Sequence, residues 1–363
     1  MRKIKVLHTE WSDGWGGQEI RIINEMLAVQ EQGVEVFLAC KVNSKIKDQA
    51  INNGIKVFIL PFRGNVDLKT MFSLIKIIKD YQIDIVNTHS GKDTWVGGIA
   101  AKLSGSKFIR TRHLSNLINS RRFNFINELA DFVFTTGESV RTDMIEFNRI
   151  DPQKIISIPT GIDEEIFDPI LFDSEAERNK LNVDNNVISI GILAVIRKFK
   201  RHDLFVEMAA ELTTRHTNLK FFIAGDGPIR DEIEEKIKKM NLQESVFLLG
   251  HIDEAAKFLS SLDIFTLTSD SKEGVPQSVM QALLMNKKVV ATNAGSTRDL
   301  YNDDNFSLVD TNNLAALVEA TESFIKNKRN TELNTRSYIV DNFSKTCMTN
   351  KIMKVYRQIL NVK

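Results

Sequence analysis

Residues 264–292, IFTLTSDSKEGVPQSVMQALLMNKKVVAT, contain one complete example of the pattern that decides the fold. The β-rich runs 264–268 and 288–292 enclose a segment, 277–285, whose apolar residues recur with helical spacing. A strand, a helix and a second strand at this spacing predict a right-handed βαβ unit with parallel strands. The loop between the first strand and the helix therefore aims one acid, Glu273, and the free N–H groups of the helix start at one place.

Short β-rich runs alternate with helical segments along the whole chain. In the first half the runs are 4–9, 35–40, 56–60, 84–89, 107–111, 132–136 and 154–160, and in the second half they are 187–193, 220–225, 246–250, 264–268, 288–292 and 306–310. Because 363 residues are too many for one comfortable core, the alternation predicts an α/β protein with two Rossmann-like doubly wound parallel-sheet domains. Such sheets bind ligands beyond the carboxyl ends of their strands, so we expect the domains to face each other across a cleft.

The acidic stretch 163–186, which Pro169 interrupts, is the best candidate for the linker between the domains. We therefore predict an N-terminal domain over 1–165, a C-terminal domain over 166–342 and a final helical segment over 343–363. The final segment has helical period and no strand after it, so we expect it to dock on a part of the fold that is already formed.

The composition is that of an ordinary globular protein, with 42% apolar residues, 26% charged residues and a net charge of +1. No global field therefore indicates nucleic acid as a partner. Cys40 and Cys347 lie far apart without metal or redox spacing, which favours a reducing compartment over a disulfide scaffold. The first apolar run is too short for a signal peptide, and no window approaches the run of about 18 apolar residues that spans a membrane. We expect a cytoplasmic protein.

Two glycine-rich loops lie between a strand and a helix. In DGWGGQE (13–19), Gly16 and Gly17 would let backbone N–H groups approach an anion, and an equally weighted alternative is a tight turn that needs positive φ. GDGPIR (225–230) contains half of a dinucleotide-binding fingerprint, but the third glycine is absent and no acid ends the next strand. Pro228 favours a plain helix start there, so a nicotinamide-dependent dehydrogenase is the least supported class.

A basic turn, RKFKR (197–201), follows the first strand of the second domain. Arg197 and Lys200 lie at the carboxyl edge of that strand, where the ligand cleft is expected. At about 4 Å and an effective dielectric near 20, each contact with a phosphate is worth roughly 4 kcal/mol before desolvation. The alternative is a solvated basic turn, and the position at the cleft edge favours the phosphate site.

Taken together, the segments resemble the retaining glycosyltransferases of the GT-B fold, in particular glycosyltransferase family 4 (glycosyl transferases group 1). The segments that carry the resemblance are GGQE (16–19), IVNTHSGKDTWVGGIAAKL (85–103), IPTGIDEEIF (158–167), RKFKRHD (197–203), GDGPIR (225–230), FLLGHIDE (247–254) and EGVPQSVMQALLMNKKVVATNAGS (273–296). Their order and spacing extend over about 280 residues and are more specific than any one of them alone. The resemblance implies transfer of a sugar from a UDP- or GDP-type nucleotide-diphosphate donor to a hydroxyl, with the anomeric configuration retained and no metal.

The resemblance also implies catalytic roles for four side chains. Glu273 matches the first acid of the family signature, which holds hydroxyls of the donor sugar. Arg197 and Lys200 match the cations that neutralise the departing diphosphate. His113 looks like the N-domain histidine that approaches the transferred sugar, and a merely structural histidine is the alternative. The last helix is similar to the family's segment that crosses back to the N-terminal domain.

The remaining matched positions are donor-binding. Gly274 and Val275 match backbone N–H groups that bind the sugar, and Ser278 and Val279 match those that bind the diphosphate. Gly16 and Gly17 match the loop that closes over donor and acceptor. His251 and Ile252, after the third strand of the second domain, lie where the family reads the base. Gln281 replaces the family's second acid, which binds the nucleotide ribose. An amide brings no charge, and charge-assisted hydrogen bonds are about twice as strong, so we expect weaker or altered ribose binding.

Because Gln281 replaces the family's second acid, one alternative is a non-catalytic homologue that binds a nucleotide sugar. A GT-B sugar-nucleotide epimerase or phosphorylase is an alternative with the same fold. Many family members glycosylate lipid-linked or lipopolysaccharide acceptors, which suggests a glycan or lipid-linked acceptor in bacterial surface-polysaccharide synthesis. The segment 110–132 interleaves Arg110, Arg112, Arg121 and Arg122 with Phe123 and Phe125, as expected for a peripheral site on an anionic membrane surface. A solvated helix with its aromatic residues in the core is an equal alternative, and no nucleic-acid motif accompanies the segment.

Overall fold

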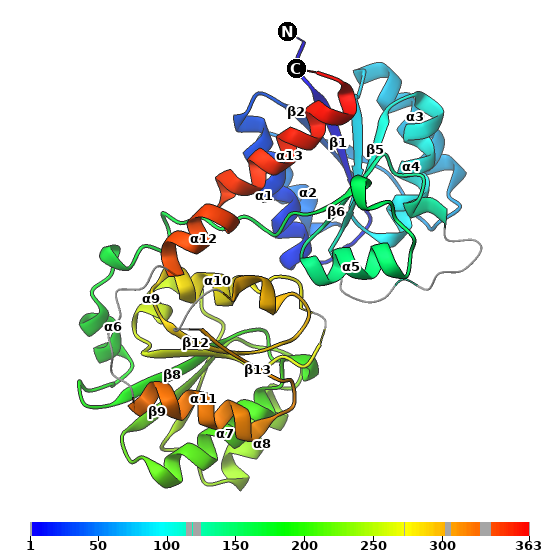
Figure 1. Cartoon of the computed structure of the whole chain (residues 1–363). Helices are drawn as coiled ribbons and strands as arrows, with labels where there is room; N and C mark the ends of the chain where they lie inside the picture. The colour runs from blue at the N-terminus through cyan, green and yellow to red at the C-terminus, as the bar shows by residue number, and fades with distance from the viewer. Residues whose placement is uncertain are drawn as a thin grey trace. The chain divides into compact units, whose positions relative to one another are not determined.

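The structure is a computed structural model that describes residues 2–113, 118, 125–271, 273–301, 306–326 and 335–362. The chain divides into two compact units, which we call unit 1 (Met1–Gly161 with Lys345–Lys363) and unit 2 (Ile162–Ser344). Figure 1 shows a parallel sheet with helices on both of its faces in each unit. The predicted boundaries, after 165 and after 342, lie within a few residues of these divisions.

Unit 1 contains a seven-stranded parallel sheet in the order β3-β2-β1-β4-β5-β6-β7. Its strands are β1 (Lys5–Glu10), β2 (Glu35–Cys40), β3 (Lys56–Ile59), β4 (Ile85–Thr88), β5 (Lys107–Arg112), β6 (Phe132–Thr135) and β7 (Ile155–Ser157). Its helices are α1 (Gly17–Glu31), α2 (Lys45–Asn52), α3 (Leu68–Tyr81), α4 (Gly91–Ser104), α5 (Glu138–Glu146) and α13 (Lys345–Leu360), with the short 3-10 helices η1 (Phe125–Asn127) and η2 (Pro152–Lys154). The strand order reverses between β1 and β4, which is where doubly wound sheets bind ligands.

Unit 2 contains a six-stranded parallel sheet in the order β10-β9-β8-β11-β12-β13. Its strands are β8 (Ile188–Leu193), β9 (Leu219–Ala224), β10 (Val246–Gly250), β11 (Ile264–Leu267), β12 (Lys288–Thr292) and β13 (Phe306–Val309). Its helices are α6 (Ser174–Lys180), α7 (His202–Arg215), α8 (Arg230–Lys239), α9 (Ala255–Ser260), α10 (Gln277–Leu284), α11 (Leu314–Lys326) and α12 (Thr335–Phe343), with η3 (Pro169–Leu171), η4 (Lys198–Lys200) and η5 (Thr297–Leu300). The strand order reverses between β8 and β11, so the prediction of two doubly wound parallel sheets is confirmed.

Each sheet is buried on both faces, as its near-continuous apolar strands predict. In unit 1, one core lies under α1 and α13, and the other lies under α3 and α4. In unit 2, one core lies under α9, α10 and α12, and the other lies under α7, α8 and α11. The final helix α13 belongs to unit 1, where Ile352 and Tyr356 are fully buried beside Ile22 and Met26 of α1.

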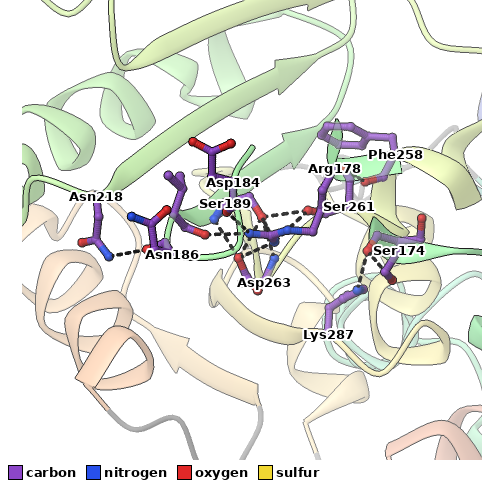
Figure 2. Close-up of polar contacts among 12 residues, drawn as sticks. Ser174, Arg178, Asp184, Asn186, Ser189, Asn218, Phe258, Ser261, Asp263 and Lys287 are labelled. Atoms are coloured by element: carbon purple, nitrogen blue, oxygen red, sulfur yellow. Dashed lines mark hydrogen bonds and ion pairs between the residues drawn. The ribbon is translucent and has the colours of Figure 1, made fainter. Parts of the chain in front are cut away.

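The segment 163–186 is not the free linker that the sequence suggested, because most of it is built into unit 2. Figure 2 shows the reason: the guanidinium of Arg178 on α6 contacts the sheet and the loops around it. Arg178 donates to Asp263 at 2.8 Å, to Ser189 at 3.1 Å and to the carbonyl of Val187 at 2.7 Å. The acidic composition did not reveal these contacts, because they depend on one side chain, Arg178, and on partners outside the segment.

Close packing between α4 and β5 depends on a glycine. A Cβ at Gly98 would lie 2.6 Å from the ring of the fully buried Phe108, whereas a Cβ at Gly91, at the start of the same helix, would meet nothing within 4 Å. We predict that Gly98→Ala lowers the free energy of unfolding by about 1–3 kcal/mol through overpacking. Urea denaturation measures the effect, and Gly91→Ala is the matched control with no loss. Equal stability of the two variants would contradict this packing.

Candidate functional site

Glu273 lies in the loop between β11 and α10 and is only 6% exposed. Its Oε1 atom accepts from Lys200 Nζ at 2.5 Å and from Ser269 Oγ at 2.5 Å. The Lys200 side chain is 17% exposed, so the ion pair is largely removed from water and its attraction is stronger than at the surface. The structure thus brings together the acid and one of the two cations that the sequence singled out.

Backbone contacts between the loops after β8 and β11 hold this pair in place. Thr268 Oγ1 donates to the carbonyl of Lys200 at 2.8 Å, and the Asp270 N–H donates to the carbonyl of Phe199 at 2.9 Å. On the other side, Gly295 has φ +54°, and a Cβ there would lie 1.9 Å from the carbonyl oxygen of Glu273. Glu273 is therefore fixed by its main chain as well as by its side chain.

Arg197 is exposed and occupies the N-cap position of η4, three residues before Lys200. The glycines of GDGP support the turn that carries it. A Cβ at Gly225 would lie 2.0 Å from the carbonyl oxygen of Ala194, and a Cβ at Gly227 would lie 2.3 Å from that of Ile196. These glycines therefore serve a close approach of backbone to the basic turn, which explains them without a dinucleotide.

The predicted helix start at Pro228 is wrong, because α8 begins at Arg230 with Ile229 as its N-cap residue. Pro228 stands in the turn before the helix. The turn sits between the glycines and α8, so a plain helix start does not explain the motif.

The start of α10 follows Glu273 directly. Pro276, at the N-cap position, has no side-chain oxygen to satisfy the first N–H groups of the helix. Val279 is fully buried in the core, so only its backbone is available to a ligand, whereas Ser278 and Gln281 are half-buried. These two are three residues apart and share a helix face. Gly274 is half-buried and Val275 is 7% exposed, so they too offer mainly backbone.

His251 and Ile252 follow β10, two strands away from β8 in the sheet. His251 Nε2 lies 3.2 Å from Asp253 Oδ1, and both side chains are exposed, at 77% and 92%. Such a surface pair contributes little to stability. Ile252 packs on the core of unit 2, which leaves His251 as the polar group of this loop.

In unit 1, the glycine pair opens α1. Gly16 has an extended backbone, with φ −166°, and Gly17 is not among the described glycines of positive φ. A Cβ on Gly17 would meet nothing within 4 Å. The alternative of a tight turn that needs positive φ is therefore wrong, and neither local strain nor packing accounts for this pair.

Glu10, at the end of β1, ties down the loop before the glycine pair. Its Oε1 accepts from the Ser12 N–H at 2.8 Å, and its Oε2 accepts from Gln18 Nε2 at 2.5 Å. Burial, with a smaller contribution from Asp93, raises the pKa of Glu10 to about 7. Sequence reasoning missed this residue, although its position at the carboxyl end of the first strand was a usable signal.

His113 follows β5 and belongs to a chain of three histidines. His8 Nδ1 lies 2.9 Å from His89 Nε2, and His89 Nδ1 lies 3.0 Å from His113 Nε2. Burial is the largest cause that lowers the pKa of each ring, to about 3 for His8 and well below the ordinary value for the other two. All three rings are therefore neutral near pH 7. His8 and His89 were not recognised from the sequence, although His8 lies in β1 and His89 directly follows β4, the strand between β1 and β5.

A cavity of about 390 Å³ opens among residues that follow β1, β4 and β5 of unit 1. Among its lining side chains are Trp11, Lys92, Trp95 and Arg112. Lys92 Nζ lies 4.0 Å from the centroid of the Trp11 ring, a cation–π contact. The cavity thus combines aromatic faces with positive charge.

At one described residue, Arg110, the basic and aromatic segment differs from its prediction as a membrane-facing surface. Arg110 is only 2% exposed and donates to the carbonyls of Thr88 at 3.2 Å and Thr111 at 3.0 Å, so its guanidinium belongs to the interior of unit 1. Phe125 packs edge-on against Trp95, with 5.3 Å between the ring centroids, but it remains 44% exposed and is not a core residue. Arg121, Arg122 and Phe123 lie outside the described residues.

The described residues also bear on two other classes of site, metal centres and membrane spans. Over the described part of the chain, no group of three or more His, Cys, Asp or Glu side chains is arranged to hold a metal ion. The described helices include none with the length and apolar character needed to cross a membrane.

Comparisons with known proteins agree with this geometry. Residues 173–343 match the family described as glycosyl transferases group 1, and residues 15–166 match glycosyltransferase family 4. The chain is a GT-B glycosyltransferase. An Escherichia coli relative, UDP-Gal:alpha-D-GlcNAc-diphosphoundecaprenol alpha-1,3-galactosyltransferase, is 24% identical over 98% of this chain and 97% of its own. A glycosyltransferase from Rickettsia africae has a TM-score of 0.88 at 23% identity, with 99% of each chain covered.

The structure of Anabaena HepE in complex with UDP is also similar, with a TM-score of 0.85 at 17% identity and coverage of 98% of this chain and 100% of that one. The prediction of a glycosyltransferase fold from the order of the segments is therefore confirmed. A dehydrogenase and an epimerase have no support from the family matches, which name transferases.

We predict that the Lys200–Glu273 contact couples the two residues energetically in the folded transferase. In a double-mutant cycle with Lys200→Met and Glu273→Gln, the double variant should be about 1–3 kcal/mol more stable than the two single losses imply. Each single change leaves a desolvated partner behind, and the double change does not. The exposed pair Lys239 and Glu235, 3.5 Å apart, is the control cycle, with coupling below about 0.5 kcal/mol. Urea denaturation measures both cycles, and additivity at Lys200 and Glu273 would refute the coupling.

Proposed function

We propose that this glycosyltransferase moves a sugar from a nucleoside diphosphate, of the UDP or GDP type, to a hydroxyl of a lipid-linked or other glycan acceptor, with retention of the anomeric configuration. The observation that carries the proposal is the contact of Glu273 with Lys200 and Ser269, directly before the start of α10. An acid for sugar hydroxyls and a cation for phosphate stand side by side there. The UDP-sugar in the name of the Escherichia coli relative and the UDP bound to HepE support this donor class.

In the proposed reaction, the bond between the sugar's anomeric carbon and the phosphate oxygen breaks, and a bond from the same carbon to the acceptor oxygen forms. The acceptor's proton passes to the departing phosphate, and attack from the face that the phosphate leaves retains the configuration. Glu273 accepts hydrogen bonds from the donor sugar. Arg197, Lys200 and the first N–H groups of α10 stabilise the negative charge that develops on the diphosphate.

The step needs no metal in this proposal, because the protein's own cations and helix start balance the diphosphate. Lys200 has a second role, because its contact with Glu273 joins the residues that bind the diphosphate to the residue that binds the sugar. In this proposal the backbone N–H groups at Gly16 and Gly17 bind the donor or the acceptor, which would account for glycines that neither strain nor packing requires.

The proposed acceptor substrate carries a sugar next to a phosphate or diphosphate. The cavity lined by Trp11, Trp95, Lys92 and Arg112 supports this choice, because aromatic faces suit sugar rings and the cations suit phosphate oxygens. The acceptor named for the Escherichia coli relative, a diphosphoundecaprenol-linked sugar, has this chemistry. A lipid-linked acceptor would place the enzyme at the cytoplasmic face of a membrane during surface-polysaccharide synthesis.

A panel of donors and acceptors tests the proposal. We expect transfer from one UDP- or GDP-sugar to a lipid-diphosphate-linked sugar, and little transfer to the same sugar as an uncharged glycoside. NMR of the product should show retention.

Arg197→Gln and Lys200→Met should each lower kcat/KM by about 10²–10³-fold, the usual effect of removing a group that stabilises developing charge. Lys198→Gln, in the same turn, is the matched control for net charge. Equal losses in all three variants, or inversion in the product, would overturn the assignment.

We predict that Gln281→Glu tightens donor binding by about 5–10-fold, because a carboxylate makes stronger hydrogen bonds to ribose hydroxyls than an amide does. Isothermal titration with the nucleoside diphosphate measures the change. Gln243→Glu, at an exposed position before β10 and therefore at the amino edge of the sheet, adds the same charge and serves as the control. Unchanged affinity in Gln281→Glu would remove the ribose role from this position and favour a different arrangement of the nucleotide.

A further inference from the structure

The three histidines of unit 1 form a hydrogen-bonded chain in which the His8 and His89 rings are nearly coplanar and the His89 and His113 rings are inclined by 36°. His8 lies in β1, His89 follows β4 and His113 follows β5, and these three strands are neighbours in the sheet. The His8 and His89 rings are inclined by only 8°, with centroids 5.2 Å apart and nitrogens 2.9 Å apart. The centroid separation exceeds the nitrogen separation by roughly one ring diameter, so the rings meet edge to edge and the hydrogen bond is nearly linear.

The neutral state of the rings restricts where their protons can be. A neutral imidazole has one N–H and one bare nitrogen, and each of the two contacts needs one of each. Only two arrangements satisfy both contacts. In the first, His8 Nδ1–H donates to His89, His89 Nδ1–H donates to His113, and His113 carries its proton on Nδ1. In the second every hydrogen bond is reversed, and the free N–H is on His8 Nε2.

The interior end of the chain selects between these arrangements. His8 Nε2 is buried and has no hydrogen-bond partner among the described residues. The second arrangement would leave an N–H donor there without an acceptor, and orphaned buried N–H groups are rare and costly. Arg21, Arg110 and Arg112 act on His113, but its ring is neutral in both arrangements, so their charges bear on the choice only through the direction of the chain's dipole.

We propose that His8 and His89 are positioning residues that fix the tautomer of His113, so that His113 presents an Nδ1–H donor and keeps its Nε2 occupied by His89. The role of that donor rests on the proposed function: His113 would donate a hydrogen bond to a hydroxyl of the transferred sugar and would not act as a general base. His8 and His89 do not touch substrate in this scheme. They act through the ring of His113.

Histidine-specific ¹⁵N NMR of the full-length protein tests the tautomer directly. The chain has six histidines, so His113→Gln and His89→Gln spectra assign the relevant ring signals. Two-bond ¹H–¹⁵N correlations distinguish a protonated nitrogen from a bare one. We expect His113 to be protonated on Nδ1 and bare on Nε2 at pH 7.5. Protonation of His113 on Nε2, or a doubly protonated ring, would overturn the proposal.

Variants of His8 test the action at a distance. Asn keeps an N–H donor near the position of Nδ1, whereas Leu removes it. We expect His8→Leu to mix the His113 tautomers and lower kcat between about 10- and 100-fold, the range found for outer-shell partners, with an unchanged donor KM. His8→Asn should restore the single tautomer and most of kcat. A loss in His8→Leu without a change of tautomer, or equal losses in both variants, would mean a merely structural role.

The two readouts separate this inference from the proposed function. The tautomer is measured without donor or acceptor, so it stands or falls even if the protein transfers no sugar. Conversely, a His113→Gln variant with full transferase activity would refute the role of His113 on the sugar and leave the hydrogen-bonded chain intact. If His8→Leu does not fold, the wild-type spectrum and His8→Asn still decide the matter.

Discussion

The burial of both faces of a parallel sheet is the constraint on which the rest of the structure depends. Strands that are apolar throughout leave only their ends for polar chemistry, and parallel pairing brings all the carboxyl ends to one edge. In unit 2, the loops after β8 and β11 carry Lys200 and Glu273, and these strands flank the reversal of strand order. In unit 1, His8 and His89 lie at the equivalent reversal between β1 and β4. The same rule therefore locates the candidate site residues of both units.

The sequence predicted those features that depend on local patterns. Strand–helix alternation was enough for both sheets, and the resemblance to the family motifs was enough to expect Glu273 and Lys200 in one site. Features that depend on one distant contact were not predictable. The segment 163–186 looked like a linker because its composition does not reveal that Arg178 contacts Asp263. Arg110 looked like a surface cation because its buried carbonyl partners appear only once β4 and β5 are paired.

The polar interior of unit 1 is expensive, which is an argument that it has a use beyond folding. Arg21 and Glu25 are fully buried 3.5 Å apart, and Asn87 adds a hydrogen bond to Glu25 at 3.0 Å. Burial raises the pKa of Glu25 and lowers that of Arg21, because each loses hydration that one partner does not fully replace. Burial and then Glu25 also raise the pKa of Tyr356, so α13 contributes to this cluster. Arg21 in turn acts on His113, which connects the buried charges to the histidine chain.

The described glycines differ in whether packing within the fold requires them. Gly225, Gly227 and Gly295 each stand where a Cβ would collide with a carbonyl oxygen of a neighbouring loop, so the fold alone explains them. Gly16 and Gly17 have neither positive φ nor a crowded Cβ position, so neither backbone strain nor packing requires them. Gly16 is the N-cap residue of α1, where glycine is favoured over alanine, so helix capping accounts for it in part. Gly17 has no such reason within the fold, and in the proposed function it lets the backbone at the start of α1 approach an anionic donor or acceptor.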